Sequence, residues 1–149
     1  MIVQFQRKLL TVHLVQMNFT DFLVIDFEGF RHKSQQFIPK EISVRGSVYQ
    51  DTILLKPPVK FSPLPEEHKK TYSWSSENLH GIPWEAGNHD HTFIFNFFNA
   101  LKLRFPNSPI FAKGTDKCNF LQNFSFNVID LDSIGCPKAS QFSYQPITV

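Results

Sequence analysis

The sequence predicts an α/β fold built around a mixed sheet, and two observations support this. Three short runs rich in β-forming residues come first, after which helical and strand-like segments alternate along the chain. The length of 149 residues suits about one domain. We therefore expect a lead-in or extra strand over 1–20, one domain over 21–135 and an irregular tail over 136–149.

The first three strands are expected to form an antiparallel meander. Phe22–Ile25 is a continuous apolar run, as expected for a strand that is buried on both faces. A second strand is predicted near Ile38–Val44 and a third near Val48–Leu55. Consecutive strands with short links usually pair antiparallel. Four prolines within Lys56–Pro65 then predict an extended connection.

The second half of the chain is expected to alternate helices with strands. Glu66–Glu77 suits a short helix, because its acidic residues lie in the first turn, near the positive end of the helix dipole. A longer helix is predicted over His91–Arg104, with Asp90 as its N-cap and a broad apolar stripe along it. The remaining predicted elements are a strand at Pro109–Ala112, a helix at Asp116–Gln122 capped by Thr115, and a strand at Asn127–Leu131.

Composition excludes several classes of protein. Charged residues are only 19% and hydrophobic residues 42%, which argues against a disordered polyelectrolyte. The net charge of +2 does not indicate nucleic-acid binding through bulk charge, although a local basic patch stays open. No apolar run approaches the roughly 20 residues that span a bilayer, so no membrane partner is expected. The start lacks a secretory cleavage site, so we expect an intracellular protein, cytoplasmic or nuclear, and not a secreted one.

A pair of acidic residues closes the first predicted strand. Residues i and i+2 of a strand point to the same side, so Asp26 and Glu28 place two carboxylates together. Such carboxylates repel one another unless a cation lies between them, and hard oxygen ligands suit Mg²⁺ or Mn²⁺. The alternative is a solvated strand end without any metal.

Four motifs follow one another in a recognisable order, covering roughly 22–131. Together they resemble the DEDD exonucleases of the ribonuclease H-like fold, in which an Asp-x-Glu at the end of the first strand precedes a three-strand meander. The antiparallel meander would then be followed by alternating helices and parallel strands. The four motifs are Asp26-Phe27-Glu28, Leu79-His80-Gly81-Ile82, the segment Phe111–Leu121, and Val128-Ile129-Asp130-Leu131.

The resemblance implies a two-metal 3′–5′ exonuclease, whose four acidic residues hold two divalent ions about 4 Å apart. Asp26 and Glu28 match the first two acidic positions. The third position falls on Lys117, while Asp116 lies one residue early, an offset of about 100° on a helix. No histidine follows His91 to supply the fourth motif, so we expect general-base help worth roughly 10²–10⁴-fold to be lost.

Binding residues are expected around the same motifs. Lys113 and Lys117 could contact phosphates, Phe27 and Phe30 could stack on bases, and His80 belongs to the family's His-Gly-Ile segment. The alternative is that these are solvated lysines, core phenylalanines and a histidine that packs within its loop. No structural zinc is expected, because no Cys-x-x-Cys spacing occurs. A buried helical thiol is favoured over a nucleophile for Cys118, and with Cys136 it gives too few cysteines for a disulfide framework.

Three functions are compatible with the sequence. The first is a degenerate exonuclease-like domain in which Lys117 neutralises the acids, and which keeps single-stranded nucleic-acid binding or a scaffolding role. The second is an active Mg²⁺- or Mn²⁺-dependent exonuclease on single-stranded RNA or DNA. It would use Asp26, Glu28 and Asp116, completed by Asp130 or Asp132. The third is an unrelated α/β protein-interaction domain. Neither a protein partner nor a homo-oligomer is predicted or excluded.

Overall fold

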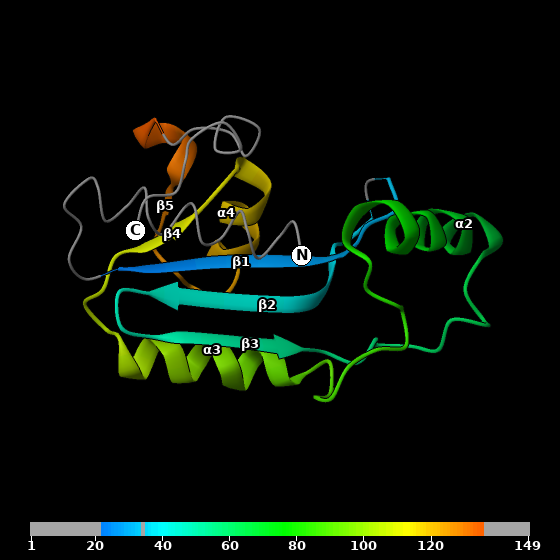
Figure 1. The fold of residues 1–149 in the computed structure, drawn as a ribbon, viewed down its shortest axis with the longest axis horizontal. Coiled ribbons are helices and arrows are strands. Elements are labelled where there is room, and N and C mark those ends of the chain that lie inside the picture. Colours follow the sequence, from blue (N-terminus) through cyan, green and yellow to red (C-terminus); the bar gives the residue numbers. More distant parts are fainter. Residues whose placement is uncertain (1–21, 34, 136–149) are drawn as a thin grey trace, which may run out of the picture. The chain divides into compact units, whose positions relative to one another are not determined.

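The computed structural model of the chain describes residues 22–33 and 35–135. Within these residues the central element is a five-stranded sheet with the strand order β3-β2-β1-β4-β5 (Figure 1). β1 pairs with β4, and β4 with β5, in parallel. The predicted α/β class with a mixed sheet is confirmed. The elements, in chain order, are β1 (Leu23–Phe30), β2 (Ile38–Gly46), β3 (Gln50–Leu54), α2 (Glu66–Ser75), the π-helical turn η1 (Ser76–His80), α3 (Phe93–Arg104), β4 (Ile110–Ala112), α4 (Thr115–Gln122), β5 (Val128–Asp130) and the 3₁₀ turn η2 (Leu131–Ile134).

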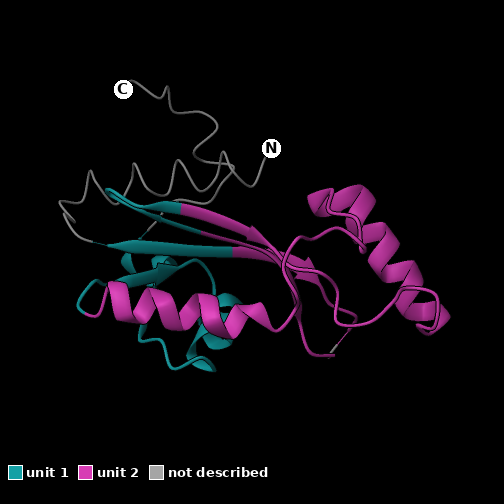
Figure 2. Cartoon of the chain, turned by 90° about the horizontal axis from the view of Figure 1, so that it is seen from below, with its two compact units in different colours: residues 1–26, 44–50, 107–149 teal, residues 27–43, 51–106 magenta. Residues whose placement is uncertain are grey.

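The chain divides into two compact units, which Figure 2 colours separately. The first unit comprises residues 1–26, 44–50 and 107–149, and the second comprises residues 27–43 and 51–106. The predicted domain over 21–135 therefore contains parts of both units. The predicted lead-in over 1–20 and the predicted tail over 136–149 lie outside the described residues.

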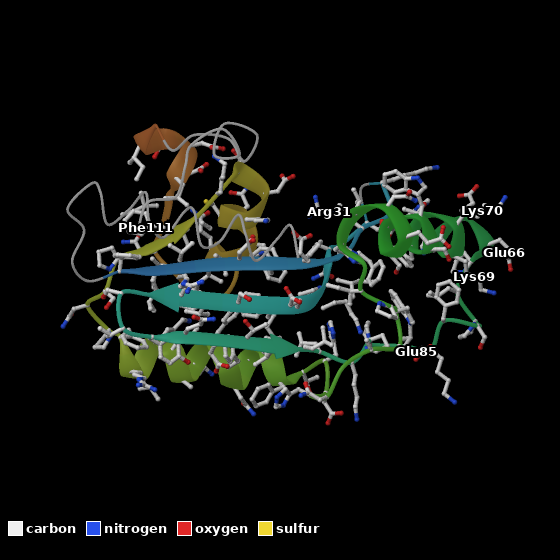
Figure 3. The ribbon with its side chains drawn as sticks, viewed as in Figure 1. Arg31, Glu66, Lys69, Lys70, Glu85 and Phe111 are labelled. Atoms are coloured by element: carbon white, nitrogen blue, oxygen red, sulfur yellow. The ribbon has the colours of Figure 1, made fainter. Side chains whose placement is uncertain are left out.

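The first unit contains the parallel strand pairs. Leu23 and Val24 of β1 lie opposite Ile110 and Phe111 of β4, and β5 continues the same register on the other side of β4. Phe111, labelled in Figure 3, is fully buried. Strands that are covered on both faces need such continuous apolar runs, which is why the start of β1 could be recognised from its sequence.

The link between β2 and β3 is an antiparallel hairpin. The Gly46 amide donates to the Tyr49 carbonyl at 2.7 Å, which closes the turn. Further from the turn, the hydroxyls of Ser43 and Thr52 are 2.8 Å apart across the two strands. β3 is shorter than predicted, because Val48 is 94% exposed in the turn. A β-branched side chain such as that of Val48 favours a strand, but here the residue lies in the hairpin turn, before β3 begins.

The backbones of β1 and β2 approach each other so closely at position 29 that only glycine fits there. A Cβ atom added to Gly29 would lie 1.9 Å from the Ile38 carbonyl oxygen. Only glycine, which has no side chain, allows β1 and β2 to lie this close at that point.

α3 and α4 begin at different residues from those predicted, whereas α2 begins at Glu66 as predicted. α3 starts at Phe93, and Thr92, not Asp90, is its N-cap residue, without a side-chain capping bond. The Asp90 carbonyl instead accepts the Phe93 amide at 2.9 Å, so a turn precedes the helix. Likewise α4 has Gly114 as its N-cap residue, and Thr115, the predicted cap, is its first helical residue.

The two main helices of the second unit contribute apolar side chains to its core. α3 buries Ile94, Phe97, Phe98 and Leu101, which is the predicted stripe. α2 ends at Ser75, earlier than predicted, and the chain continues into the π-helical turn η1. None of the helices in the described part of the chain combines the length and the hydropathy needed to cross a bilayer. A separate cluster of the core is formed by Phe30, Tyr72 and Trp84, with Ile38, Phe61 and Leu64 packed against it.

Candidate functional site

The two acids singled out by the sequence both lie in β1, as predicted. Asp26 is buried, with 8% of its surface exposed, and belongs to the first unit. Glu28 is half-buried and belongs to the second unit. β1 does not end at these acids, because it continues to Phe30.

The lysine at the third acidic position of the motif pairs with the first acid. Lys117 lies in the first turns of α4, and its Nζ donates a hydrogen bond to Asp26 Oδ1. The side chain of Asp26 is 12% exposed and that of Lys117 31%, so the ion pair is largely shielded from water. A buried carboxylate needs a partner of opposite charge, and here a side chain of the same chain provides it.

The loop before α4 positions this lysine. Gly114 adopts a φ of +99°, which side-chain-bearing residues rarely adopt, and its amide donates to Asp130 Oδ1 at 3.0 Å. The Gly114 carbonyl accepts the Cys118 amide at 3.1 Å, which closes the first turn of the helix. The Asp130 carboxylate therefore ties the end of β5 to the start of α4, and Lys117 is carried on that first turn.

The other acids proposed as completing ligands are also engaged. In addition to the Gly114 amide, Asp130 Oδ1 accepts a hydrogen bond from the Asp132 amide at 2.9 Å. The Asp130 side chain thereby caps η2. Lys113 Nζ forms an ion pair with Asp132 Oδ1, and the two side chains are 24% and 54% exposed. Both lysines that were predicted to contact phosphates thus contact aspartates of the first unit.

Asp116, the alternative third acid, lies exposed in the first turn of α4. A carboxylate there interacts favourably with the helix dipole. Across residues 22–33 and 35–135, no group of three or more His, Cys, Asp or Glu side chains is arranged to hold a metal ion.

Both phenylalanines proposed to stack on bases, Phe27 and Phe30, are buried. Phe27 is 3% exposed and packs against Phe37 at a centroid distance of 5.5 Å. Phe30 is 1% exposed and contacts Tyr72 and Trp84 in the core of the second unit. A base needs an accessible ring face for stacking, and neither ring provides one.

The His80 ring links β1 to the loop after η1 within the second unit. Its Nε2 donates to the Gly29 carbonyl at 2.9 Å, and its Nδ1 accepts the Ile82 amide at 3.0 Å. Its ring also packs edge-on against Phe30, at a centroid distance of 4.9 Å. Burial lowers the pKa of His80, which keeps the ring in the neutral form that these two bonds require. Both ring nitrogens are therefore used within the protein.

The only described cysteine, Cys118, is buried, as the sequence favoured. Burial, together with the nearby Asp130 and Asp132, raises its pKa to about 11. The thiol therefore stays protonated at neutral pH and is a poor nucleophile.

Sequence reasoning missed a fully buried lysine in β2. Lys40 Nζ donates to the Trp84 carbonyl at 2.7 Å and also to the Ala86 carbonyl. These bonds anchor the loop after η1 to the sheet within the second unit. No local pattern marks Lys40, since its partners lie more than 40 residues further along the chain.

Comparison with protein-family models, with curated proteins and with solved structures finds no match for this chain.

Proposed function

We propose that the chain is a degenerate exonuclease-like domain of the ribonuclease H-like fold, which has lost metal-dependent hydrolysis and keeps a binding or scaffolding role. The fold assignment draws support from the strand order β3-β2-β1-β4-β5 and from the parallel β1, β4 and β5. This is the meander followed by parallel strands that the motif resemblance implies. The Asp26–Lys117 ion pair is the observation that carries the functional part.

The ion pair argues against catalysis for an electrostatic reason. In the two-metal mechanism the first acid binds a divalent cation, and the third acid completes the coordination. A lysine ammonium beside a divalent ion would be repelled by about 8 kcal/mol, taking about 4 kcal/mol for two unit charges 4 Å apart at the protein surface and doubling it. Lys117 already neutralises Asp26, so the carboxylate has no need of a metal.

Binding is the role that such a domain can retain. The side chains of Lys113 and Lys117 are 24% and 31% exposed, so neither lysine is fully buried. Single-stranded RNA or DNA is the partner that the resemblance implies, through phosphate contacts and not through stacking on Phe27 or Phe30. A protein partner is the alternative for a scaffolding role.

The proposal is tested by incubating the purified chain with labelled single-stranded RNA and DNA in Mn²⁺ or Mg²⁺. We expect no shortening of either substrate. Binding is followed in the same samples by fluorescence polarisation, where Lys113→Gln should weaken a genuine phosphate contact and flatten its salt dependence. Metal-dependent degradation that Asp26→Ala abolishes would overturn the proposal and establish the active exonuclease instead.

A further inference from the structure

The loop over residues 84–91 lies within the second unit and precedes α3. Its start is tied to β2, because the fully buried Lys40 donates hydrogen bonds to the Trp84 and Ala86 carbonyls. A buried ammonium group needs such acceptors, so the position of this loop and the burial of Lys40 depend on each other.

The middle of the loop lies directly against the backbone at the end of β3. The Asn88 and His89 amides both donate to the Leu54 carbonyl, at 3.0 and 3.3 Å, and the Lys56 amide donates to the His89 carbonyl at 2.7 Å. A Cβ atom added to Gly87 would lie 2.4 Å from the Lys56 nitrogen, so the two segments touch without a side chain between them. These amides therefore report whether the loop is docked on the strand end.

His91 ends the loop with one ring nitrogen bonded and the other without a partner. The ring donates a hydrogen bond to the Lys56 carbonyl. Nδ1 is buried and has no hydrogen-bond partner among residues 22–33 and 35–135, so Nε2 is the donor and Nδ1 carries no proton in the neutral ring. Protonation adds an N–H at Nδ1, and a buried charged donor without an acceptor costs more free energy than a bare lone pair.

The charges around the ring also oppose its protonation. Burial lowers the pKa of His91, the bond to the Lys56 carbonyl acts against this, and the positive charge of Lys40 lowers the pKa further. Glu85 acts on Lys40 and favours its charged form. The first two turns of α3 carry no charged residue, and the side chains of Lys56 and Asp90 are exposed. The docked loop therefore favours the neutral imidazole.

We propose that protonation of His91 releases the loop over 84–91 from β2 and from the end of β3, which makes this loop an acid-sensitive element of the second unit. The proton creates an unsatisfied buried donor and a second positive charge that acts on the Lys40 ammonium, and moving the ring into water removes both penalties. Release also dismantles a cleft of about 370 Å³ that the loop forms with Lys56 and the start of α3. The inference does not rest on the proposed loss of catalysis.

Acid should open the loop because the released ring takes up a proton more readily than the docked ring. A histidine in water has a pKa of about 6.5, and the docked ring has a lower one. As pH falls below 6.5, the released fraction should therefore rise by up to about tenfold per pH unit, until the docked ring is protonated as well. At pH 7.5 the ring is neutral in both states, so docking no longer depends on its charge.

The experiment measures amide hydrogen exchange of the whole chain by NMR at pH 5.5 and pH 7.5. The Asn88 and His89 amides are the probes, because both bond to the Leu54 carbonyl in the docked loop. The Gly46 amide of the β2–β3 hairpin is the internal reference. After correction for the intrinsic exchange rate, we expect the protection of both probes to fall about three- to tenfold more than that of Gly46 at the lower pH.

Two variants assign the effect to one ring. In His91→Gln the side-chain amide can still donate to the Lys56 carbonyl but does not titrate, so the pH dependence of both probes should vanish. His89→Gln is the matched control, because it removes the other histidine of the same loop, whose ring stacks on Phe93 at a centroid distance of 4.3 Å. This control should leave the pH dependence in place.

The proposal is overturned if the probes lose no more protection than Gly46, if His91→Gln keeps the pH dependence, or if His89→Gln removes it. If His91→Gln does not fold, the parent chain provides the test through an NMR titration of the His91 ring. The loss of protection at Asn88 and His89 must then level off at the pH where this ring titrates. A ring that titrates at or above pH 6.5, or a loss of protection that levels off elsewhere, overturns the proposal.

Discussion

Replacing Lys117 by methionine is expected to destabilise the fold through the charge that it leaves behind. Methionine keeps the length and helix propensity of the side chain, so α4 itself is little affected. Asp26, with a side chain only 12% exposed, would lose its ionic partner. Breaking a fully buried pair costs about 3–5 kcal/mol, whereas surface pairs contribute about 0–1 kcal/mol. For this partly shielded pair we expect a loss of about 2 kcal/mol in the free energy of unfolding.

A double-mutant cycle isolates the interaction. Urea unfolding of the parent chain, Lys117→Met, Asp26→Asn and the double variant gives the coupling energy, which we expect to be about 1–2 kcal/mol. The exposed Glu66–Lys69 pair on α2 serves as control, because its carboxylate side chain is 81% exposed and its coupling should stay below about 0.5 kcal/mol. A coupling at Asp26–Lys117 no larger than this control would refute the reasoning.

Three further predictions concern single residues. Gly29→Ala should destabilise the chain by more than about 3 kcal/mol in urea unfolding, because its Cβ would lie 1.9 Å from a carbonyl oxygen of β2. Burial lowers the pKa of Lys40 from 10.5 to about 8, so the unfolded state binds more protons above pH 8. The free energy of unfolding should therefore rise there with pH, by at most about 1.4 kcal/mol per unit, and Lys40→Met should remove that slope. Burial also lowers the pKa of His80 below 6.5, so stability should fall as pH drops below 6.5, and His80→Gln should reduce this fall.

Each of these has its own control or contradicting result. Gly81→Ala meets no atom within 4 Å and should cost only the strain of its φ of +70°, so an equal loss at both glycines would contradict the steric argument. The Lys40 slope is to be measured below pH 9, because the raised pKa of Cys118 lowers stability above that value. An unchanged slope in Lys40→Met, or an unchanged acid limb in His80→Gln, would show that other groups dominate.

Local patterns predicted most elements because each segment carries its own signal. The apolar run at Phe22–Ile25 marks the start of β1, but the polar residues after it suggested a strand end that β1 passes through as far as Phe30. Val48 suggested a strand because of its propensity, although the hairpin turn exposes it. Propensity describes one residue, whereas strand ends depend on the partner strand.

The candidate site could be predicted only in part. Motif order located Asp26 and Lys117, which are 91 residues apart, and suggested that the lysine neutralises the acids; the fold shows that Lys117 pairs with Asp26. The aromatic cluster of the second unit could not be foreseen, since Phe61, Tyr72 and Trp84 come from three separate segments. Phe30 matched an expected base-stacking residue by type, and its burial in the core excludes that role.

The most direct test of the account is the effect of Mn²⁺ on the melting temperature. A metal that binds only the native state must raise the melting temperature in a saturable way. We predict no such rise for the parent chain at millimolar Mn²⁺, because Lys117 already occupies the Asp26 carboxylate. A saturable rise that disappears in Asp26→Asn would contradict the account and favour an active metal-dependent exonuclease instead.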